Sequence, residues 1–319
     1  CAGQRGMPGG EEEPVQGSRR NIHAEEGGWI QTGGPSGGYI NDLAQDSQDP
    51  DRLYAAGSPL GLYTSIDKGQ TWRLLPFPEE NPGEEIEVDP FRPDTLYCTF
   101  SNFSRSDDRG RSWQPINRDF GAWGYVTAFI LHPKKPGVLY AAVRRFGQTR
   151  VRLLMSEDRG ESWEDISGLI VDRAVASIGA LAWSSGRIYA ALNYCDEQQH
   201  YRGKLYTAED NGASWRELSF GQREKRFIFS VFANPYVEGE IWLSEGPLYN
   251  EGIDQPIIYR SLDNGANWSP VYLRNVRFDS TQVRIIGAGA NGRIYVAAGA
   301  ELLCTSDGGQ TFEEITPDR

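Results

Sequence analysis

The chain has 319 residues, of which 24% are charged and 12% aromatic, and its formal net charge is −12. This acidic excess argues against nucleic acid as a partner, because binding to phosphates requires clustered Lys and Arg. No apolar run approaches the roughly 18 residues of a membrane-spanning helix, and the many glycines and prolines together with abundant Tyr and Trp are typical of one large β domain.

The chain begins at Cys1, and residues 1–28 are Gly-rich, charged and almost devoid of core-forming side chains. We expect this stretch to be a flexible tether. A Cys-Ala-Gly start before a polar spacer resembles a mature bacterial lipoprotein. That resemblance implies that Cys1 carries a lipid and that the protein is extracytoplasmic, anchored to a membrane in the periplasm or at the cell surface. The alternative is an arbitrary boundary of the sequence.

A short pattern, S-x-D-x-G-x-[ST]-W with small departures, occurs six times along the chain at intervals of roughly forty to fifty residues. Its Asp can accept hydrogen bonds from turn amides, and its Gly can adopt a positive φ without steric cost. Each copy therefore predicts a hairpin turn between two antiparallel strands. We expect the invariant residues of these boxes to be structural, namely Asp67, Gly69, Asp108, Gly110, Asp158, Gly160, Asp210, Gly212, Asp263, Gly265, Asp307 and Gly309.

Another apolar segment, such as Leu53-Tyr54-Ala55-Ala56, precedes each hairpin, and a further strand precedes that segment. A four-stranded sheet cannot bury both faces alone, so neighbouring repeats must stack, and radial closure gives a propeller. The sequence predicts an all-β fold, a β-propeller of four-stranded antiparallel blades over residues 29–319. Six boxes indicate six blades. The segment Trp29-Ile30-Gln31-Thr32 has the pattern of a strand that follows a box, so a seventh, degenerate blade is the alternative.

These repeats resemble the Asp-box (BNR) repeat propellers, which include sialidases, xyloglucan-cleaving glycosidases, sortilin-type receptors and a photosystem II assembly factor. The resemblance covers residues 29–319 and implies the fold, but the family hosts unrelated functions. We expect no cofactor and no metal site, because the sequence has no P-loop, Rossmann fingerprint or EF-hand loop. The cysteines after Cys1 lie in different repeats, and Cys195 is expected in a loop.

Three consecutive repeats carry insertions between their second and third strands, at residues 144–151, 193–204 and 246–256. In an up-and-down blade these turns lie on the rim opposite the boxes. Aromatic side chains beside charges suit recognition, so we expect this face to bind a protein or glycan partner. The candidate binding residues are Trp123, Tyr125, Arg144, Arg145, Phe146, Tyr194, His200, Tyr201 and Tyr249. The alternative is solvated loops whose aromatic rings fold back on the rim.

A catalytic role has weaker support in the sequence. Sialidase relatives carry an [FY]-R-I-P motif, but the nearest match, Phe91-Arg92-Pro93, lacks the Ile and falls on the box-side rim. Xyloglucan-cleaving relatives place an Asp where this chain has residues 57–61, which contain no carboxylate. Inverting hydrolysis needs two carboxyls roughly 6.5 to 9.5 Å apart. The carboxylates left for such a pair are Glu84, Glu85, Asp196, Glu197 and Glu245.

We therefore assign no catalytic residue and expect a binding scaffold. The alternatives are a glycoside hydrolase of sialidase or xyloglucanase type and an assembly factor for a membrane protein complex.

Overall fold

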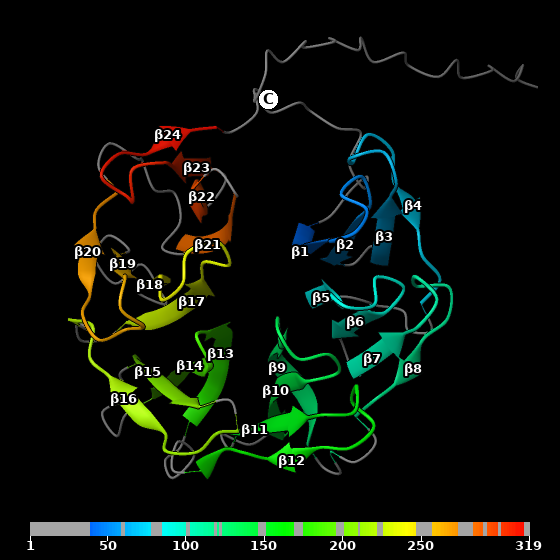
Figure 1. The fold of residues 1–319 in the computed structure, drawn as a ribbon, viewed down its shortest axis with the longest axis horizontal. Helices are drawn as coiled ribbons and strands as arrows, with labels where there is room; N and C mark the ends of the chain where they lie inside the picture. Colours follow the sequence, from blue (N-terminus) through cyan, green and yellow to red (C-terminus); the bar gives the residue numbers. More distant parts are fainter. Residues whose placement is uncertain are drawn as a thin grey trace, which may run out of the picture.

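The protein is a ring of six four-stranded antiparallel sheets, as Figure 1 shows for the computed structural model. The structure describes residues 39–58, 61–77, 85–99, 103–117, 120, 123–145, 151–168, 175–195, 201–209, 211–221, 226–246, 257–273, 283–289, 292–298 and 301–315. The predicted all-β propeller is confirmed, and its six blades are the sheets that the described residues form. These residues include no helix with the length and apolar character needed to cross a membrane.

Each blade takes four consecutive strands. Blade 1 contains β1 (Tyr39–Gln45), β2 (Leu53–Ser58), β3 (Gly61–Ser65) and β4 (Arg73–Leu74). Blade 2 contains β5 (Glu85–Val88), β6 (Leu96–Thr99), β7 (Phe103–Ser106) and β8 (Gln114–Pro115). Blade 3 contains β9 (Trp123–Leu131), β10 (Leu139–Arg145), β11 (Val151–Ser156) and β12 (Glu164–Asp165).

Blade 4 contains β13 (Val175–Ser184), β14 (Arg187–Cys195), β15 (Tyr201–Glu209) and β16 (Arg216–Leu218). Blade 5 contains β17 (Phe227–Ala233), β18 (Ile241–Gly246), β19 (Ile257–Ser261) and β20 (Ser269–Val271). Blade 6 contains β21 (Val283–Ala288), β22 (Ile294–Ala298), β23 (Glu301–Thr305) and β24 (Glu313–Glu314).

The four strands of every blade follow one another from the centre of the ring outwards (Figure 1). The boxes join the third strand to the fourth, so they all lie on one rim of the ring. The hairpins between the second and third strands lie on the other rim, which we call the loop-rich face. In blade 3, for example, Leu139 pairs with Ser156 at the box end of β10, and Arg144 pairs with Val151 at the loop-rich end.

The core of the molecule lies between the blades. Five apolar clusters fill the five junctions from blade 1/blade 2 to blade 5/blade 6. The second strands contribute an aromatic residue that is fully buried against the next blade in five cases, namely Tyr54, Tyr97, Tyr140, Tyr189 and Trp242. Successive residues of a strand point to opposite faces of the sheet. The apolar segment of each second strand therefore contributes side chains to both of the junctions that its blade forms with its neighbours.

Candidate functional site

On the loop-rich face of blade 3, an aromatic ring and an arginine lie opposite each other on neighbouring strands. Tyr125 of β9 pairs with Arg144 of β10, and the guanidinium carbon lies 5.3 Å from the centre of the tyrosine ring. One step further along the same strands, Trp123 pairs with Arg145. A guanidinium over an aromatic face is held by the ring quadrupole, at about 0.5 to 1 kcal/mol where the pair is exposed. Blade 3 thus presents a preorganised cation beside an aromatic surface.

Blade 4 repeats this combination at its own loop-rich end. Tyr194 of β14 pairs with Arg202 of β15, and Cys195 pairs with Tyr201. The expectation that Cys195 lies in a loop is wrong, because the two strands continue their ladder to this point. Tyr residues on both strands favour extended backbone and cross-strand packing. The segment 193–204 is therefore a long hairpin with a shorter tip than the sequence indicates.

Several candidate binding residues cannot be placed in this face. Phe146, His200 and Tyr249 lie outside the described residues, as do Cys1, the tether at residues 1–28, Asp210, Glu84, Asp196 and Glu197. For Trp123, Arg145 and Tyr201 the structure describes the backbone only. The face described here consequently consists of Tyr125, Arg144, Tyr194 and Arg202, and it spans two neighbouring blades.

Blade 5 carries a buried charged network that the sequence analysis missed. Arg226 and Glu245 are 2% and 1% exposed, and the Arg226 Nε lies 3.8 Å from the Glu245 Oε1. The Tyr259 hydroxyl donates to the same carboxylate oxygen at 3.1 Å. Arg226 directly precedes β17, and Glu245 lies near the end of β18, so this network fixes the loop-rich end of blade 5. No sequence motif signals it, because its members come from three separate segments.

Carboxylates also line two junctions near the centre of the ring. The Asp42 Oδ2 accepts a hydrogen bond from the Ile86 amide at 2.8 Å. Glu85 and Glu87 likewise accept from amides of β9, at 3.1 and 3.2 Å. Burial raises the pKa of Asp42 to about 6, although its backbone hydrogen bonds oppose this shift. Burial, reinforced by the charges of Asp42 and Glu85, raises the pKa of Glu87 well above its usual value.

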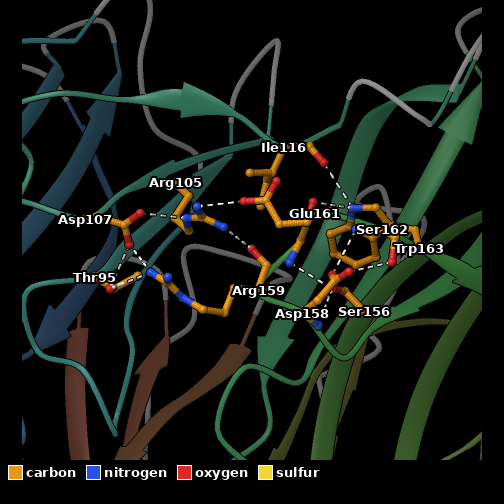
Figure 2. A network of polar contacts seen from close by, with 11 residues as sticks. Thr95, Arg105, Asp107, Ile116, Ser156, Asp158, Arg159, Glu161, Ser162 and Trp163 are labelled. Atoms are coloured by element: carbon orange, nitrogen blue, oxygen red, sulfur yellow. Dashed lines mark hydrogen bonds and ion pairs between the residues drawn. The ribbon is translucent and has the colours of Figure 1, made fainter.

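On the opposite rim, the box carboxylates are held within their own turns. In the blade 3 box, the Ser156 Oγ accepts from the Gly160 amide and donates to the Asp158 Oδ1, both at 2.8 Å (Figure 2). The Asp158 carboxylate accepts in turn from the Ser162 amide at 2.8 Å and from its hydroxyl at 2.6 Å. The boxes of blades 1, 2, 5 and 6 repeat these contacts.

The box hydrogen bonds also set the charge of these carboxylates. A hydrogen bond from Ser112 is the main reason why the pKa of Asp108 falls to about 2, and one from Asn267 does the same for Asp263. Both groups are therefore ionised throughout the physiological range. The backbone conformation and the close packing of the box favour glycine. Gly160, for example, has a φ of +87°, and an added Cβ would lie 2.6 Å from the Ile116 Cδ1 of the preceding blade.

Arginines connect neighbouring boxes along the same rim. Arg105, which is 5% exposed, donates to the Asp107 Oδ2 at 3.1 Å, to the Glu161 Oε1 at 2.8 Å and to the carbonyl of Arg159 at 2.7 Å (Figure 2). The Arg159 guanidinium of blade 3 in turn donates hydrogen bonds to the Asp107 carboxylate and the Thr95 hydroxyl of blade 2. This network ties blade 2 to blade 3, and nothing in the sequence analysis anticipated it.

The motif considered for a catalytic arginine lies on this rim as well. Phe91 and Arg92 sit in the turn between β5 and β6, where their amides donate to the Asp89 Oδ1 at 2.9 and 3.2 Å. A groove of about 610 Å³ also opens on the box side, between blades 5 and 6, with Arg260, Tyr272 and Asp307 in its lining. Its carboxylates are those of the boxes, which the turns already engage.

Comparison with known proteins agrees with this architecture. A family model described as a BNR repeat-like domain matches residues 93–227. A probable oligoxyloglucan-reducing end-specific xyloglucanase of Neosartorya fischeri is 30% identical over 145 residues, which are 40% of this chain and 17% of that protein. Xyloglucanase Xgh74A of Acetivibrio thermocellus is 23% identical over 280 residues, which are 73% of this chain and 32% of that protein. The chain thus spans a third or less of these curated relatives.

Solved structures share the fold at low identity. The GH74 xyloglucanase from Xanthomonas campestris superposes with a TM-score of 0.63 at 20% identity, over 83% of this chain and 44% of that one. YCF48 from Cyanidioschyzon merolae gives 0.58 at 14% identity, over 90% and 88% of the two chains. YCF48 bound to D1 peptide gives 0.56 at 20% identity, over 89% and 84%. The predicted resemblance to the BNR-repeat propellers is confirmed by the six-bladed ring, by the family model over residues 93–227 and by these shared folds.

Proposed function

We propose that this chain is a binding propeller that captures an extended segment of a partner protein on its loop-rich face. The observation that carries the proposal is the pairing of aromatic rings with arginines on two neighbouring blades, Tyr125 with Arg144 and Tyr194 with Arg202. Tyr and Arg are enriched where protein interfaces bind most strongly, because each combines a large apolar area with a polar end. A preorganised pair also loses little conformational freedom on binding.

The extent of the structural matches supports a binding role over a purely catalytic one. This chain matches YCF48 structures over 84% and 88% of their length, and one of them holds a D1 peptide. It matches the solved xyloglucanases over less than half of theirs. An assembly factor that binds a peptide segment of its partner is therefore the form of this function that we favour.

A glycoside hydrolase is the second candidate, because the curated relatives with significant identity are xyloglucanases. Two carboxylates considered for such a pair are described, and each has a structural partner. Glu85 accepts from the Phe129 amide, and Glu245 is buried against Arg226 and Tyr259. Neither is free to act on a sugar in this arrangement. We therefore expect binding without turnover.

The test selects peptides from a displayed library on the immobilised full chain and measures the dissociation constant of a selected peptide by calorimetry. Tyr194→Ala and Arg144→Ala should each weaken binding about tenfold or more, as expected for interface anchors. Tyr236→Ala is the matched control, because this tyrosine is 57% exposed in the turn between β17 and β18 on the other rim. Unchanged affinity in both loop-rich variants would refute the site. Release of new reducing ends from xyloglucan oligosaccharides would favour the hydrolase.

A further inference from the structure

A buried turn position on the box-side rim holds an imidazole in blade 3 where other blades hold an oxygen. The residue that directly follows the innermost strand is Asp46 in blade 1, Asp89 in blade 2, His132 in blade 3 and Asn234 in blade 5. All four residues are 1 to 5% exposed. One oxygen of each Asp accepts from the amides two and three residues further on, at 2.8 to 3.2 Å, and the Asn234 Oδ1 accepts from the first of these amides at 3.0 Å. The turn therefore depends on a side-chain acceptor at this position.

In blade 3 the acceptor is the Nδ1 of His132. It accepts from the amides of Lys134 and Lys135 at 2.9 and 3.0 Å. A ring nitrogen accepts a hydrogen bond only when it carries no proton, so the closed turn holds the imidazole in its neutral form with the proton on Nε2. A proton added to Nδ1 would face two N–H groups, and both amides would lose their acceptor in a buried site.

The same turn connects blade 3 to blade 4. The centre of the His132 ring lies 4.5 Å from that of Trp183 on β13 and 6.3 Å from that of Tyr140 on β10. The Lys134 ammonium lies 5.4 Å from the centre of the Trp183 ring. Trp183 packs on the apolar cluster between blades 3 and 4. Opening of the turn would therefore remove an aromatic contact and a cation–π contact from this junction.

The surroundings of the ring oppose a positive charge on it. Burial disfavours the charged form of an imidazole, and so do cations nearby. Two ammonium groups belong to the turn itself, and the blade 3 box packs on the turn at Gly137. The titratable and charged residues packed against the turn include Lys134 and Lys135 on the turn, Glu157 and Arg159 on the box and the Tyr140 phenol on β10. These groups carry three positive charges and one negative charge, so their sum also favours the neutral ring.

We propose that His132 makes the junction between blades 3 and 4 sensitive to mild acid: protonation of this ring opens its turn and loosens the two blades at the box-side rim. The unfolded chain takes up a proton at the ordinary histidine pKa of about 6.5, whereas the closed turn resists protonation. The contribution of this turn to stability is therefore fully present above about pH 6.5 and is lost as the pH falls below that value. Blades 1, 2 and 5 have Asp or Asn at this position, so the response belongs to one junction.

The first test compares the pH dependence of unfolding in the full chain and in two variants of it. His132→Asn supplies the acceptor that blade 5 uses and does not titrate in this range. Between pH 7.5 and pH 5.5 we expect the ratio of folded to unfolded protein in urea to fall about tenfold more in the parent than in this variant, because the proton binds the unfolded chain. His23→Asn, which removes an imidazole near the start of the sequence, is the matched control and should behave like the parent. The titrations of Asp42 and Glu87 are common to all three chains and cancel in the comparison.

The second test follows the turn itself by hydrogen exchange. The amides of Lys134 and Lys135 are compared with those of Phe91 and Arg92, which donate to a carboxylate in the equivalent turn of blade 2. From pH 7.5 to pH 5.5 the protection of the first pair relative to the second should fall about tenfold in the parent and stay constant in His132→Asn.

Three results would overturn the proposal. The first is a parallel pH dependence of unfolding in the parent and in His132→Asn. The second is a loss of stability in acid with unchanged relative protection of the turn amides, because protonation would then act elsewhere. The third is a parent that gains stability in acid relative to His132→Asn, because the folded site would then favour the charged ring.

Discussion

Replacing Arg105 with Met tests whether the box-side rim holds the ring together. The Met side chain retains much of the apolar stem, so the change reports mainly on the lost polar contacts. Arg105 donates to Asp107, to Glu161 and to the carbonyl of Arg159, and it joins blade 2 to blade 3. The bond to Glu161 contributes little, because that side chain is 65% exposed and water replaces its partner.

The hydrogen bonds to Asp107 and to the Arg159 carbonyl account for the expected loss of stability. Each involves the buried guanidinium, and hydrogen bonds of charged groups contribute about 1.5 to 3 kcal/mol in favourable cases. Asp107 keeps its contact with Arg159 in the variant, which limits the loss of stability. We expect the free energy of unfolding in urea to fall by about 2 to 4 kcal/mol with an unchanged dependence on denaturant. Arg111→Met, at an exposed position of the same box, is the control. A loss below about 0.5 kcal/mol for Arg105→Met would refute the reasoning.

Three further predictions concern the turns and the centre of the ring. Asp158→Ala should lower the free energy of unfolding by about 1 to 3 kcal/mol, because the Ser162 amide and hydroxyl lose their acceptor; a denaturation midpoint equal to that of the parent contradicts this. Gly160→Ala should lower the thermal midpoint, because its φ of +87° disfavours a side chain and the new Cβ meets Ile116; adding Ile116→Val should restore part of the loss, and no restoration would argue against the clash. Burial raises the pKa of Asp42 from 3.8 to about 6, so the folded state binds its proton more readily than the unfolded state. Stability from this group therefore increases as the pH falls through 6, and the parent should gain stability relative to Asp42→Asn in urea titrations between pH 7 and pH 5; a constant difference would exclude the shift.

The sequence was sufficient to predict the blades because their chemistry is local. The oxygens of a box Asp accept hydrogen bonds from the residue four positions further on, as Asp158 does from Ser162. The interactions that form the turn therefore lie within one short segment of the sequence. The apolar segment before each box also repeats in the same register, because the second strand of every blade packs against both neighbouring blades. Six copies of both patterns leave a ring of four-stranded sheets as the natural arrangement.

Contacts between blades could not be predicted in the same way. Arg105 and Arg260 occupy one repeat position, directly before the hydroxyl residue of the box, and each donates to the carbonyl that precedes the next box glycine. The remaining blades have other residue types there, for example Met155, so the repeat pattern treats the position as variable. The extended hairpin that contains Cys195 was missed for a related reason, because pairing across a hairpin depends on its tip and not on the repeat.

The two rims therefore have different freedom to change. On the box rim, an altered residue disturbs a turn and also the blade that packs on it, as the approach of Gly160 to Ile116 shows. On the loop-rich face, strands such as β14 and β15 extend beyond the core, so residues there can vary without opening a junction. A binding surface built on these ends can change its specificity at little cost in stability. This asymmetry is the physical reason for expecting the Tyr194→Ala variant to lose its partner and keep its stability, and for expecting the Arg105→Met variant to lose stability and still bind its partner when folded.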